Sequence, residues 1–354
     1  MTPDEVAILV VCYNAGALLE RCLASVVAAE DCDGARIGRI VVVDNASTDG
    51  AAEGVEGRFP GVDLVRSEKN LGFAGGNVLG WDHVCRVAPD VSYVYLLNQD
   101  AVVAPDFLGP LVSWMRDHPG TATAQSLLLL DDDREKVNSL GNRSHYLGFG
   151  FVTGLSETAR DDLKPAAVDY TSGAAVLVRA SVVEQVGLFE PEMFMYLEDA
   201  DLSWKARQIG LENVMVPASR AYHQYEPGVP MHHYYYLERN RGWLLLVYYR
   251  SETLLLLCPA LVLMEMVQVG FALMHGHLRE KLGSWGYFLR SQRLRRILAL
   301  RRAVQARRTI DDRAFLGNFA GRIEYPTLTS PLLRYVVNPL FAAYWFVARR
   351  LIRW

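Results

Sequence analysis

Three polar clusters in the sequence have the residue types and spacing of a site for a phosphorylated ligand. In the first, Asn98 and Asp100 stand two residues apart after an apolar run, so both side chains can face one cation or diphosphate. In the second, Asp44 and Asp49 flank a Ser/Thr-rich turn, where a carboxylate can accept hydrogen bonds from a nucleoside. Helix capping is an equally good interpretation of either carboxylate taken singly.

The third cluster is a glycine-rich loop over residues 70–77 that opens a predicted helix. Where side chains are missing, backbone N–H groups can approach phosphate oxygens at a helix N-terminus. The loop is neither G-x-G-x-x-G nor a Walker loop with its lysine, which disfavours a dehydrogenase or an ATPase. A turn without a ligand is the alternative. Six residues in this loop and after the first strand are expected to contact the phosphorylated ligand: Asn14, Asn70, Gly72, Gly75, Gly76 and Asn77.

Two further positions carry acid–base or metal-binding chemistry. Glu198, Asp199 and Asp201 cluster at a predicted helix start, where crowded carboxylates raise one another's pKa and can leave one as a general base. An acidic first turn that complements the helix dipole is the alternative. His223 follows a predicted strand and can ligate a metal through a neutral ring nitrogen, although a single histidine is more often structural.

These side chains need a scaffold, and the order of elements predicts one. Apolar runs at 7–12, 40–43, 62–66 and 93–97 alternate with helical patterns over the first hundred residues. Such alternation predicts parallel strands in a doubly wound α/β sheet, with the ligand beyond the carboxyl ends of the strands. Further strands are expected at 173–178 and 213–216, with a helix running from 198 to about 209.

Charge and composition divide the chain. Its 354 residues are 51% hydrophobic and 21% charged, which excludes a disordered chain. Residues 1–230 hold 17 basic and 33 acidic side chains (net −16), and residues 231–354 hold 19 and 7 (net +12). The acidic part is a poor nucleic-acid binder. Five cysteines without a C-x-x-C pair indicate a reducing compartment, and the acidic start lacks the positive charge of a signal peptide, so we expect a cytoplasmic protein.

The basic part has the pattern of a membrane-associated region. Residues 254–274 form an apolar run long enough to span a bilayer, but the run contains Pro259, Glu265 and Gln268. Ten basic residues and one acid lie between 276 and 310, and the apolar, aromatic stretch 332–352 includes several arginines. This composition favours the anionic inner face of the cell membrane over nucleic acid. Spanning, lying in one leaflet and forming a soluble helical cap all stay open.

Together the motifs resemble those of family 2 glycosyltransferases with the GT-A fold, particularly the bacterial rhamnosyltransferase-like branch. They occur in the family's order across about residues 6–225. The matching stretches are VVCYNAG (10–16), VVVDNASTDG (41–50), NLGFAGGN (70–77), YLLNQD (95–100), GAAVLVRA (173–180), MYLEDADLSWKARQIG (195–210) and the pair Tyr222-His223.

The resemblance implies a GT-A catalytic domain over 1–235, with a Rossmann-like, mostly parallel mixed sheet and flanking helices, and a membrane-associating helical region over 236–354. It assigns Asp44 to the nucleotide base and the stretch from Asn98 to Asp100 to the D-x-D metal and diphosphate motif. It assigns the catalytic base to Asp199, with Glu198 beside it, and a further metal ligand to His223. Asn98 departs from the motif, so Asp100 carries more of the metal assignment. Arg239 and Arg241 are either an additional diphosphate clamp or part of the basic tail.

The implied activity is an inverting transfer of a sugar, with rhamnose as a candidate, from a UDP or dTDP donor. Mg²⁺ or Mn²⁺ would assist, and the acceptor would be a hydroxyl of a glycan or lipid-linked molecule in cell-surface polysaccharide synthesis. A non-catalytic, nucleotide-sugar-binding membrane scaffold is the alternative. A hydride-transferring dinucleotide enzyme is a third hypothesis, but the sequence lacks the glycine fingerprint of that class of enzyme.

Overall fold

The computed structural model describes residues 4–30, 34–225, 233–323 and 331–354, and the chain divides into two compact units. The first unit takes residues up to 142, 152–206 and 211–226, and the second takes 143–151, 207–210 and the chain from 227 onward. The boundary expected between residues 235 and 236 falls inside helix α7 (Tyr234–Tyr248), which belongs as a whole to the second unit.

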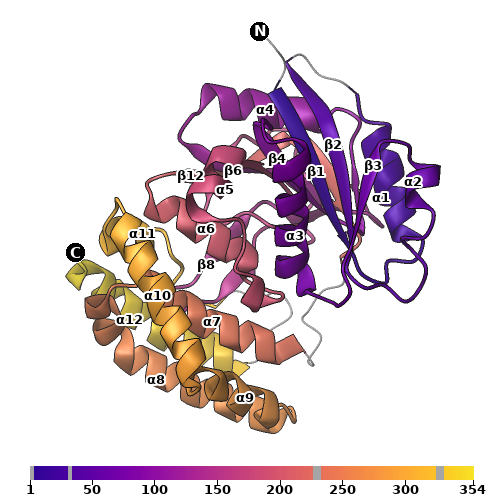
Figure 1. Ribbon diagram of the computed structural model, residues 1–354. Helices are drawn as coiled ribbons and strands as arrows, with labels where there is room; N and C mark the ends of the chain where they lie inside the picture. The colour runs from indigo at the N-terminus through magenta and orange to yellow at the C-terminus, as the bar shows by residue number, and fades with distance from the viewer. Residues whose placement is uncertain (1–3, 31–33, 226–232, 324–330) are drawn as a thin grey trace. The chain divides into compact units, whose positions relative to one another are not determined.

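A mixed ten-stranded sheet is the centre of the first unit (Figure 1). Its order is β10-β12-β6-β11-β4-β1-β2-β3, with β5 paired to β12 and β7 paired to β6. The strands β8 and β9 form a sheet of their own. The bounds are β1 Asp4–Cys12, β2 Ala35–Asp44, β3 Val62–Arg66, β4 Tyr93–Asn98, β5 Ala101–Val103, β6 Thr121–Leu130, β7 Val137–Ser139, β8 Asn142–Ser144, β9 Gly150–Val152, β10 Ala166–Val168, β11 Ala175–Arg179 and β12 Glu212–His223.

Parallel pairing, as expected from the alternating pattern, joins β4, β1, β2 and β3. The continuous apolar run of β1 follows from its place between two parallel neighbours, where both of its faces are buried. The whole sheet is mixed, because β11 runs antiparallel to both β4 and β6. The mixed sheet agrees with the GT-A expectation.

The sequence did not predict strand β6, although it is ten residues long and nearly all buried. Its first half alternates threonine and alanine and then carries Gln125 and Ser126, a composition that looks like a loop. In the fold these polar groups have partners: the Gln125 side chain accepts from Ser172 N (2.7 Å), and Ser126 bonds the Tyr95 hydroxyl (2.8 Å). Buried polar side chains are tolerated when they are hydrogen-bonded, and those partners are distant in sequence.

Helices flank this sheet in the first unit. They are α1 Leu18–Val27, α2 Val55–Arg58, α3 Gly72–Val87, α4 Leu108–Asp117, α5 Ala180–Val186, the 3₁₀ turn η1 Pro191–Met193 and α6 Glu198–Gln208. Two glycines bring α3 close to the sheet: a Cβ on Gly76 would lie 2.7 Å from Val11 Cγ1, and one on Gly80 would lie 2.6 Å from Leu9 Cδ1. The glycine-rich segment is therefore the beginning of a tightly packed helix, and most of it is not a loop.

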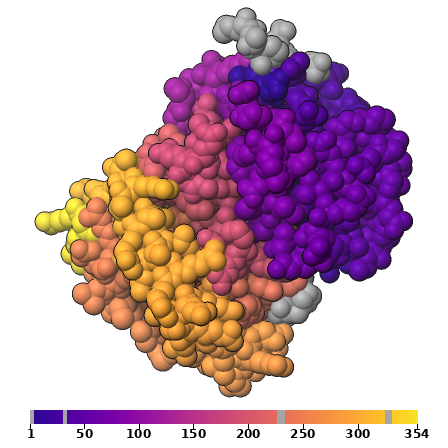
Figure 2. Space-filling view, in the orientation of Figure 1, coloured from indigo at the N-terminus to yellow at the C-terminus, as the bar shows by residue number. Residues whose placement is uncertain are grey.

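The described part of the second unit is mainly helical. It contains α7, α8 Ser251–Met274, α9 Leu278–Phe288, α10 Ser291–Arg307, α11 Asp312–Leu316, the π-helical turn η3 Leu333–Val337 and α12 Asn338–Leu351. Helix α7 contacts α9 and α10, and α8 contacts α9 and α12. The orange surface of α9 and α10 faces the viewer in Figure 2. Within the described residues, α8 alone is long and apolar enough to cross a bilayer by length and composition.

Candidate functional site

The carboxyl ends of three adjacent strands hold the residues expected at the donor site. Asp44 ends β2 beside Cys12 of β1, and Asn98 ends β4 beside Val11 of β1. Asn14 is the second residue after the end of β1. Strands lie about 4.8 Å apart, so Asp44 and Asn98 stand about 10 Å apart across the edge. The fold thus brings these three predicted residues to one edge of the sheet.

Asn14 and Asp49 hold the two loops at this edge together. Asp49 accepts hydrogen bonds from the backbone of Ala51 (3.0 Å) and Gly16 (2.8 Å), which lower its pKa from the ordinary value. The Asn14 side chain accepts from Thr48 N at 2.8 Å. Both side chains therefore brace the loops, whatever further contact they make with a ligand.

Asp44 caps its own turn and also faces the edge. One carboxylate oxygen accepts from Ser47 N at 3.0 Å, the capping role that its sequence context allowed. The Asp44 side chain is half-buried, and its assignment to a nucleotide base stays a prediction.

Asn45, which the sequence reasoning passed over, joins this edge to helix α3. Its buried side chain donates to Asn70 Oδ1 (3.0 Å) and to the Gly72 carbonyl (3.1 Å), and it accepts from Leu71 N (2.8 Å). The position next to Asp44 at a strand end was the only local signal. Asn45 fixes the start of α3 against β2, and Asn70 takes part in that junction.

The beginning of α3 offers fewer N–H groups than a phosphate loop would. Gly72 N donates to Asn70 Oδ1 (2.7 Å) and Ala74 N to the Phe194 carbonyl (3.0 Å). Asn77 is buried and donates to the Phe73 carbonyl (2.9 Å). Several of these groups thus have partners within the protein. Two glycines of the same segment are buried inside the helix and closely packed, and their contact with the donor stays a prediction: Gly75 and Gly76.

The side chains of Asn98, Asp100 and His223 converge. Antiparallel pairing of β5 with β12 sets His223 opposite Ala101, one residue after Asp100. His223 Nε2 lies 3.3 Å from Asp100 Oδ1 and 3.3 Å from Asn98 Nδ2. His223 is the last residue of β12, which is longer than expected, and does not follow the strand. These two carboxyl-edge residues and the histidine form one cluster.

Asn138, which the sequence reasoning missed, orients the histidine. Its Oδ1 lies 3.0 Å from His223 Nδ1, and both residues are buried. An amide oxygen can only accept, so Nδ1 of His223 donates to Asn138, and Nε2 faces Asn98 Nδ2 and Asp100 Oδ1. Asn138 lies on the short strand β7 in an irregular stretch of sequence, and no local pattern marks it.

The cluster fits a divalent cation. Asn98 Oδ1 and Asp100 Oδ1 are buried acceptors without a hydrogen-bond donor, and such acceptors are costly unless something compensates them. Together with Nε2 of His223 they make a set of oxygen and imidazole donors, a combination that suits Mn²⁺ or Mg²⁺. In the described part of the chain, no three His, Cys, Asp or Glu side chains gather into a metal-binding group, so the amide of Asn98 has to complete the set.

Gln99, between the two ligands, has a structural task. Its side chain accepts from Tyr13 N (2.7 Å) and donates to the Tyr13 carbonyl (3.2 Å), as a neighbouring strand would. Gln99 thereby ties the end of β4 to the loop after β1.

Glu198 and Asp199 begin α6 with perturbed acidities. Burial raises the pKa of Asp199 to about 6, although hydrogen bonds from Ala200 N (2.7 Å) and Gly173 N (3.4 Å) oppose the shift. Burial and the neighbouring Asp199 raise the pKa of Glu198 well above its ordinary value, and Glu198 Oε2 has no hydrogen-bond partner. Burial thus makes Asp199 a stronger base than an ordinary aspartate and favours the neutral form of Glu198.

A short chain of backbone contacts connects this acid pair to the cation cluster. Asp199 accepts from Gly173 N, and the next residue, Ala174, accepts from Asn98 N at 2.9 Å. A Cβ added to Gly173 would lie 3.7 Å from Asp199 Cβ. The fold therefore holds Asp199 beside the β4 edge, in the same unit as Asp100 and His223.

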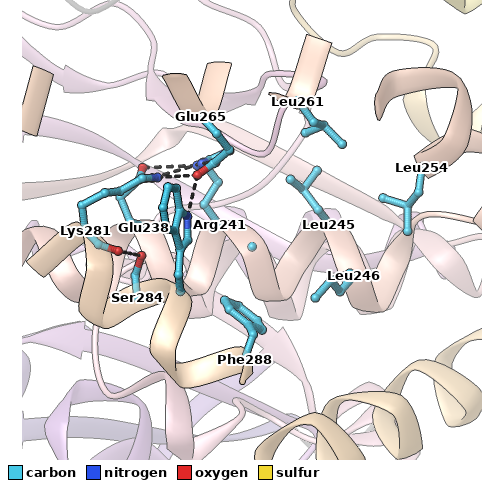
Figure 3. Close-up of a pocket in the computed structure, with 12 residues that line it drawn as sticks. Glu238, Arg241, Leu245, Leu246, Leu254, Leu261, Glu265, Lys281, Ser284 and Phe288 are labelled. Atoms are coloured by element: carbon cyan, nitrogen blue, oxygen red, sulfur yellow. Dashed lines mark hydrogen bonds and ion pairs between the residues drawn. The ribbon is translucent and has the colours of Figure 1, made fainter. Parts of the chain in front are cut away.

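The two arginines expected as a clamp lie in the second unit. Arg241 is buried and donates to Glu238 (3.0 Å) and to Glu265 (Figure 3). It also donates to the Leu147 carbonyl (3.2 Å). Its guanidinium is occupied inside this unit, which favours the interpretation that it belongs to the helical tail. Arg239 is buried too and bonds Asn240 Oδ1 at 2.8 Å.

Comparison with known proteins identifies the family. Residues 7–187 match the family described as Glycosyl transferase family 2, which is half of the chain. The N-acetylglucosaminyl-diphospho-decaprenol L-rhamnosyltransferases of two Mycobacterium tuberculosis strains are 29% identical over 238 residues, covering 62% of this chain and 76% of theirs. A crystal structure of GalNAc-T7 with UDP, GalNAc and Mn²⁺ superposes with a TM-score of 0.55 at 16% identity. That match covers 70% of this chain but only 49% of the other, so the chain spans about half of that protein's length. The chain belongs to glycosyl transferase family 2 and is a glycosyltransferase with the GT-A fold.

Proposed function

We propose that this glycosyltransferase moves a sugar, with inversion, from a nucleoside-diphosphate donor to a hydroxyl of a lipid-linked acceptor. UDP and dTDP are the candidate nucleotides and rhamnose is a candidate sugar. The observation that supports this most is the position of an ionisable carboxyl, Asp199, two backbone contacts away from the buried Asn98, Asp100 and His223 cluster.

On the donor side, Asp100, His223 and Asn98 would hold Mg²⁺ or Mn²⁺. When bound, a divalent cation neutralises the charge that develops on a departing diphosphate. Asn138 keeps the Nε2 lone pair of His223 directed to the cation position. Asp44, about 10 Å away at the end of β2, would accept hydrogen bonds from the nucleoside.

On the acceptor side, Asp199 would act as general base. The acceptor O–H proton passes to the Asp199 carboxylate while the oxygen attacks the anomeric carbon. The bond from that carbon to the diphosphate breaks on the opposite face, and its electron pair leaves with the nucleotide. No covalent enzyme intermediate forms, so the configuration at the anomeric carbon inverts. Because the pKa of Asp199 is about 6, the residue is ionised yet basic enough to accept a proton near neutral pH.

The lipid-linked acceptor and the location at the inner face of the membrane are supported by two observations. The mycobacterial relatives are named for a decaprenol-linked substrate. The C-terminal part of this chain combines a net charge of +12 with long apolar segments. A cytoplasmic enzyme held at an anionic membrane surface combines both features.

The test compares Asp199→Asn with Glu198→Gln in the full-length protein. We expect Asp199→Asn to lower turnover with nucleotide-sugar and Mn²⁺ by about 10²- to 10⁴-fold, because the general base is lost. Glu198→Gln should lose less than about tenfold, since burial and the neighbouring Asp199 favour the neutral form of Glu198, which glutamine resembles. Calorimetric titration with UDP or dTDP in the presence of Mn²⁺ should give similar affinities for both variants and the wild type.

The assignment fails if Asp199→Asn retains wild-type turnover, or if Glu198→Gln is the more damaged variant. A wild-type protein that binds the nucleotide sugar but neither transfers nor hydrolyses it would favour the non-catalytic scaffold instead.

A further inference from the structure

We propose that α8 does not cross the membrane, and that α8 and α12 together form a face that lies in the cytoplasmic leaflet of an anionic bilayer. This inference deepens the proposed function, because it rests on the idea that the acceptor is membrane-bound. The argument depends on what holds each side of α8.

One face of α8 is packed against the protein and the opposite face is exposed. Thr253, Leu257, Ala260 and Met264 are buried. Four of the exposed apolar residues follow a spacing of seven and four, which places them along a single line of the helix. They are Leu255 (77% exposed), Val262 (54%), Met266 (60%) and Leu273 (65%). A helix that is apolar on both faces but packed on only one has the pattern expected between protein and lipid.

Ion pairs fasten the middle of α8 to the two neighbouring helices. Glu265, the fifteenth of the 24 residues of α8, pairs with Arg241 of α7 and with Lys281 of α9, and accepts from Trp285 Nε1 (2.8 Å). Glu238 of α7 completes the cluster by pairing with both cations (Figure 3). These pairs lower the pKa of Glu265 to about 2 although burial opposes the shift, so the carboxyl is ionised.

This cluster is incompatible with a spanning α8. If the helix crossed a bilayer, Glu265 would lie near the middle of the hydrocarbon, together with the side chains that pair with it. Helices α7 and α9 have 15 and 11 residues, or about 22 and 16 Å, so neither can cross a core of about 30 Å beside it. Charged residues within the hydrocarbon are energetically costly. Glu265 also ties α8 to the two short helices through its ion pairs with Arg241 and Lys281, so these helices would have to enter the hydrocarbon with it.

Helix α12 adds a second apolar line next to the first. Its exposed residues Leu340 (52%), Val347 (56%) and Leu351 (51%) again have a spacing of seven and four. The Tyr344 hydroxyl donates to the Leu256 carbonyl, which hydrogen-bonds α12 to α8. Trp354, three residues beyond the end of α12, donates from Nε1 to Thr253 Oγ1 of α8 (2.9 Å).

Charge indicates which occupant this face takes. Residues 331–354 contain four arginines and no acidic residue. Arg334, Arg349 and Arg350 are exposed beside the apolar line, and Arg350 lies 3.5 Å from the ring centroid of the exposed Phe346. Apolar side chains bordered by arginine suit the interface of an anionic leaflet, and a second copy of the same cationic face would be repelled.

The binding test uses full-length protein and liposomes of phosphatidylcholine with or without phosphatidylglycerol. Wild type should sediment with the anionic liposomes. The double substitution Val262→Glu and Met266→Glu should lower the partition coefficient by more than about tenfold, because two exposed apolar side chains that would enter the leaflet become charged. Val27→Glu is the matched control, since Val27 is equally exposed (52%) but lies on α1 of the first unit. Donor hydrolysis with Mn²⁺ should stay unchanged in all three proteins, which separates this inference from the proposed activity.

The topology test distinguishes lying from spanning. In a variant with Cys32, Cys85 and Cys258 replaced by serine, Glu252→Cys and His275→Cys place one thiol near each end of α8. A membrane-impermeant maleimide should label both thiols in inverted membrane vesicles and neither in spheroplasts. Labelling of one end from each side would overturn the proposal. The proposal would also be overturned if the wild type were a dimer that does not bind liposomes and if Val262→Glu converted this dimer to a monomer.

Discussion

Replacing Asp199 by asparagine should stabilise the protein while removing its activity. Burial raises the pKa of this carboxyl from 3.8 to about 6, so the folded state resists its ionisation while the unfolded state does not. A raised carboxyl pKa means that stability is highest at low pH and is lost as the pH rises through the folded pKa. Linkage makes the cost about 3 kcal/mol at pH 7.5 and about 1 kcal/mol at pH 4.5.

The asparagine keeps one of the two hydrogen bonds of Asp199. The bond from Ala200 N (2.7 Å) can be retained and the weaker one from Gly173 N (3.4 Å) is lost, at a cost of about 1 kcal/mol. The net gain in the free energy of unfolding is therefore about 2 kcal/mol at pH 7.5 and about zero at pH 4.5. Urea unfolding of both proteins at the two pH values measures it.

Asp49→Asn is the control of opposite sign. Backbone hydrogen bonds lower the pKa of Asp49, so its contribution to stability is present above the unfolded pKa and is lost as the pH falls. This variant should be destabilised at pH 7.5. The reasoning about Asp199 is refuted if Asp199→Asn is less stable than wild type at pH 7.5, or if its gain is the same at both pH values.

Two further predictions concern positions that the sequence did not mark or marked for another reason. Asn138→Ala should weaken Mn²⁺ binding by about 10- to 100-fold, because His223 loses the acceptor that orients it. Electron paramagnetic resonance of free Mn²⁺ measures this without turnover, and unchanged affinity would contradict the orienting role. Gly76→Ala should destabilise the protein by about 1–3 kcal/mol through its clash with Val11. Thermal unfolding measures this effect. Gly57→Ala is the control, because a Cβ at Gly57 meets nothing within 4 Å, and it should be neutral or stabilising. Equal effects of the two substitutions would argue against close packing of α3.

The contrast between β1 and β6 shows what kind of strand a sequence can predict. The apolar run of β1 reports burial on both faces, and burial of apolar side chains needs no particular partner. The polar side chains of Thr123, Gln125 and Ser126 in β6 are buried because groups distant in sequence accept or donate their hydrogen bonds. Nothing near β6 in the sequence reveals those partners.

The candidate site divides in the same way. The spacing of Asn98 and Asp100 and the acid pair at 198 and 199 were recognisable from residue type and position. Asn138 and Asn45 were not, because an asparagine becomes a positioning residue only through the group that it bonds. The glycines of α3 also have a packing role that no local pattern revealed, since a Cβ on Gly76 or Gly80 would meet Val11 or Leu9 of β1.

The sequence by itself determined the family, the parallel half of the sheet, and the acidic and basic division of the chain, since all three depend on local pattern and composition. Only the tertiary structure decided that β11 runs antiparallel, that His223 presents Nε2 beside Asp100, and that Glu265 is held by Arg241 and Lys281. Strand direction, histidine orientation and ion pairing are relations between distant segments. Their free energies depend on distance and burial in space, which no local stretch of residues contains.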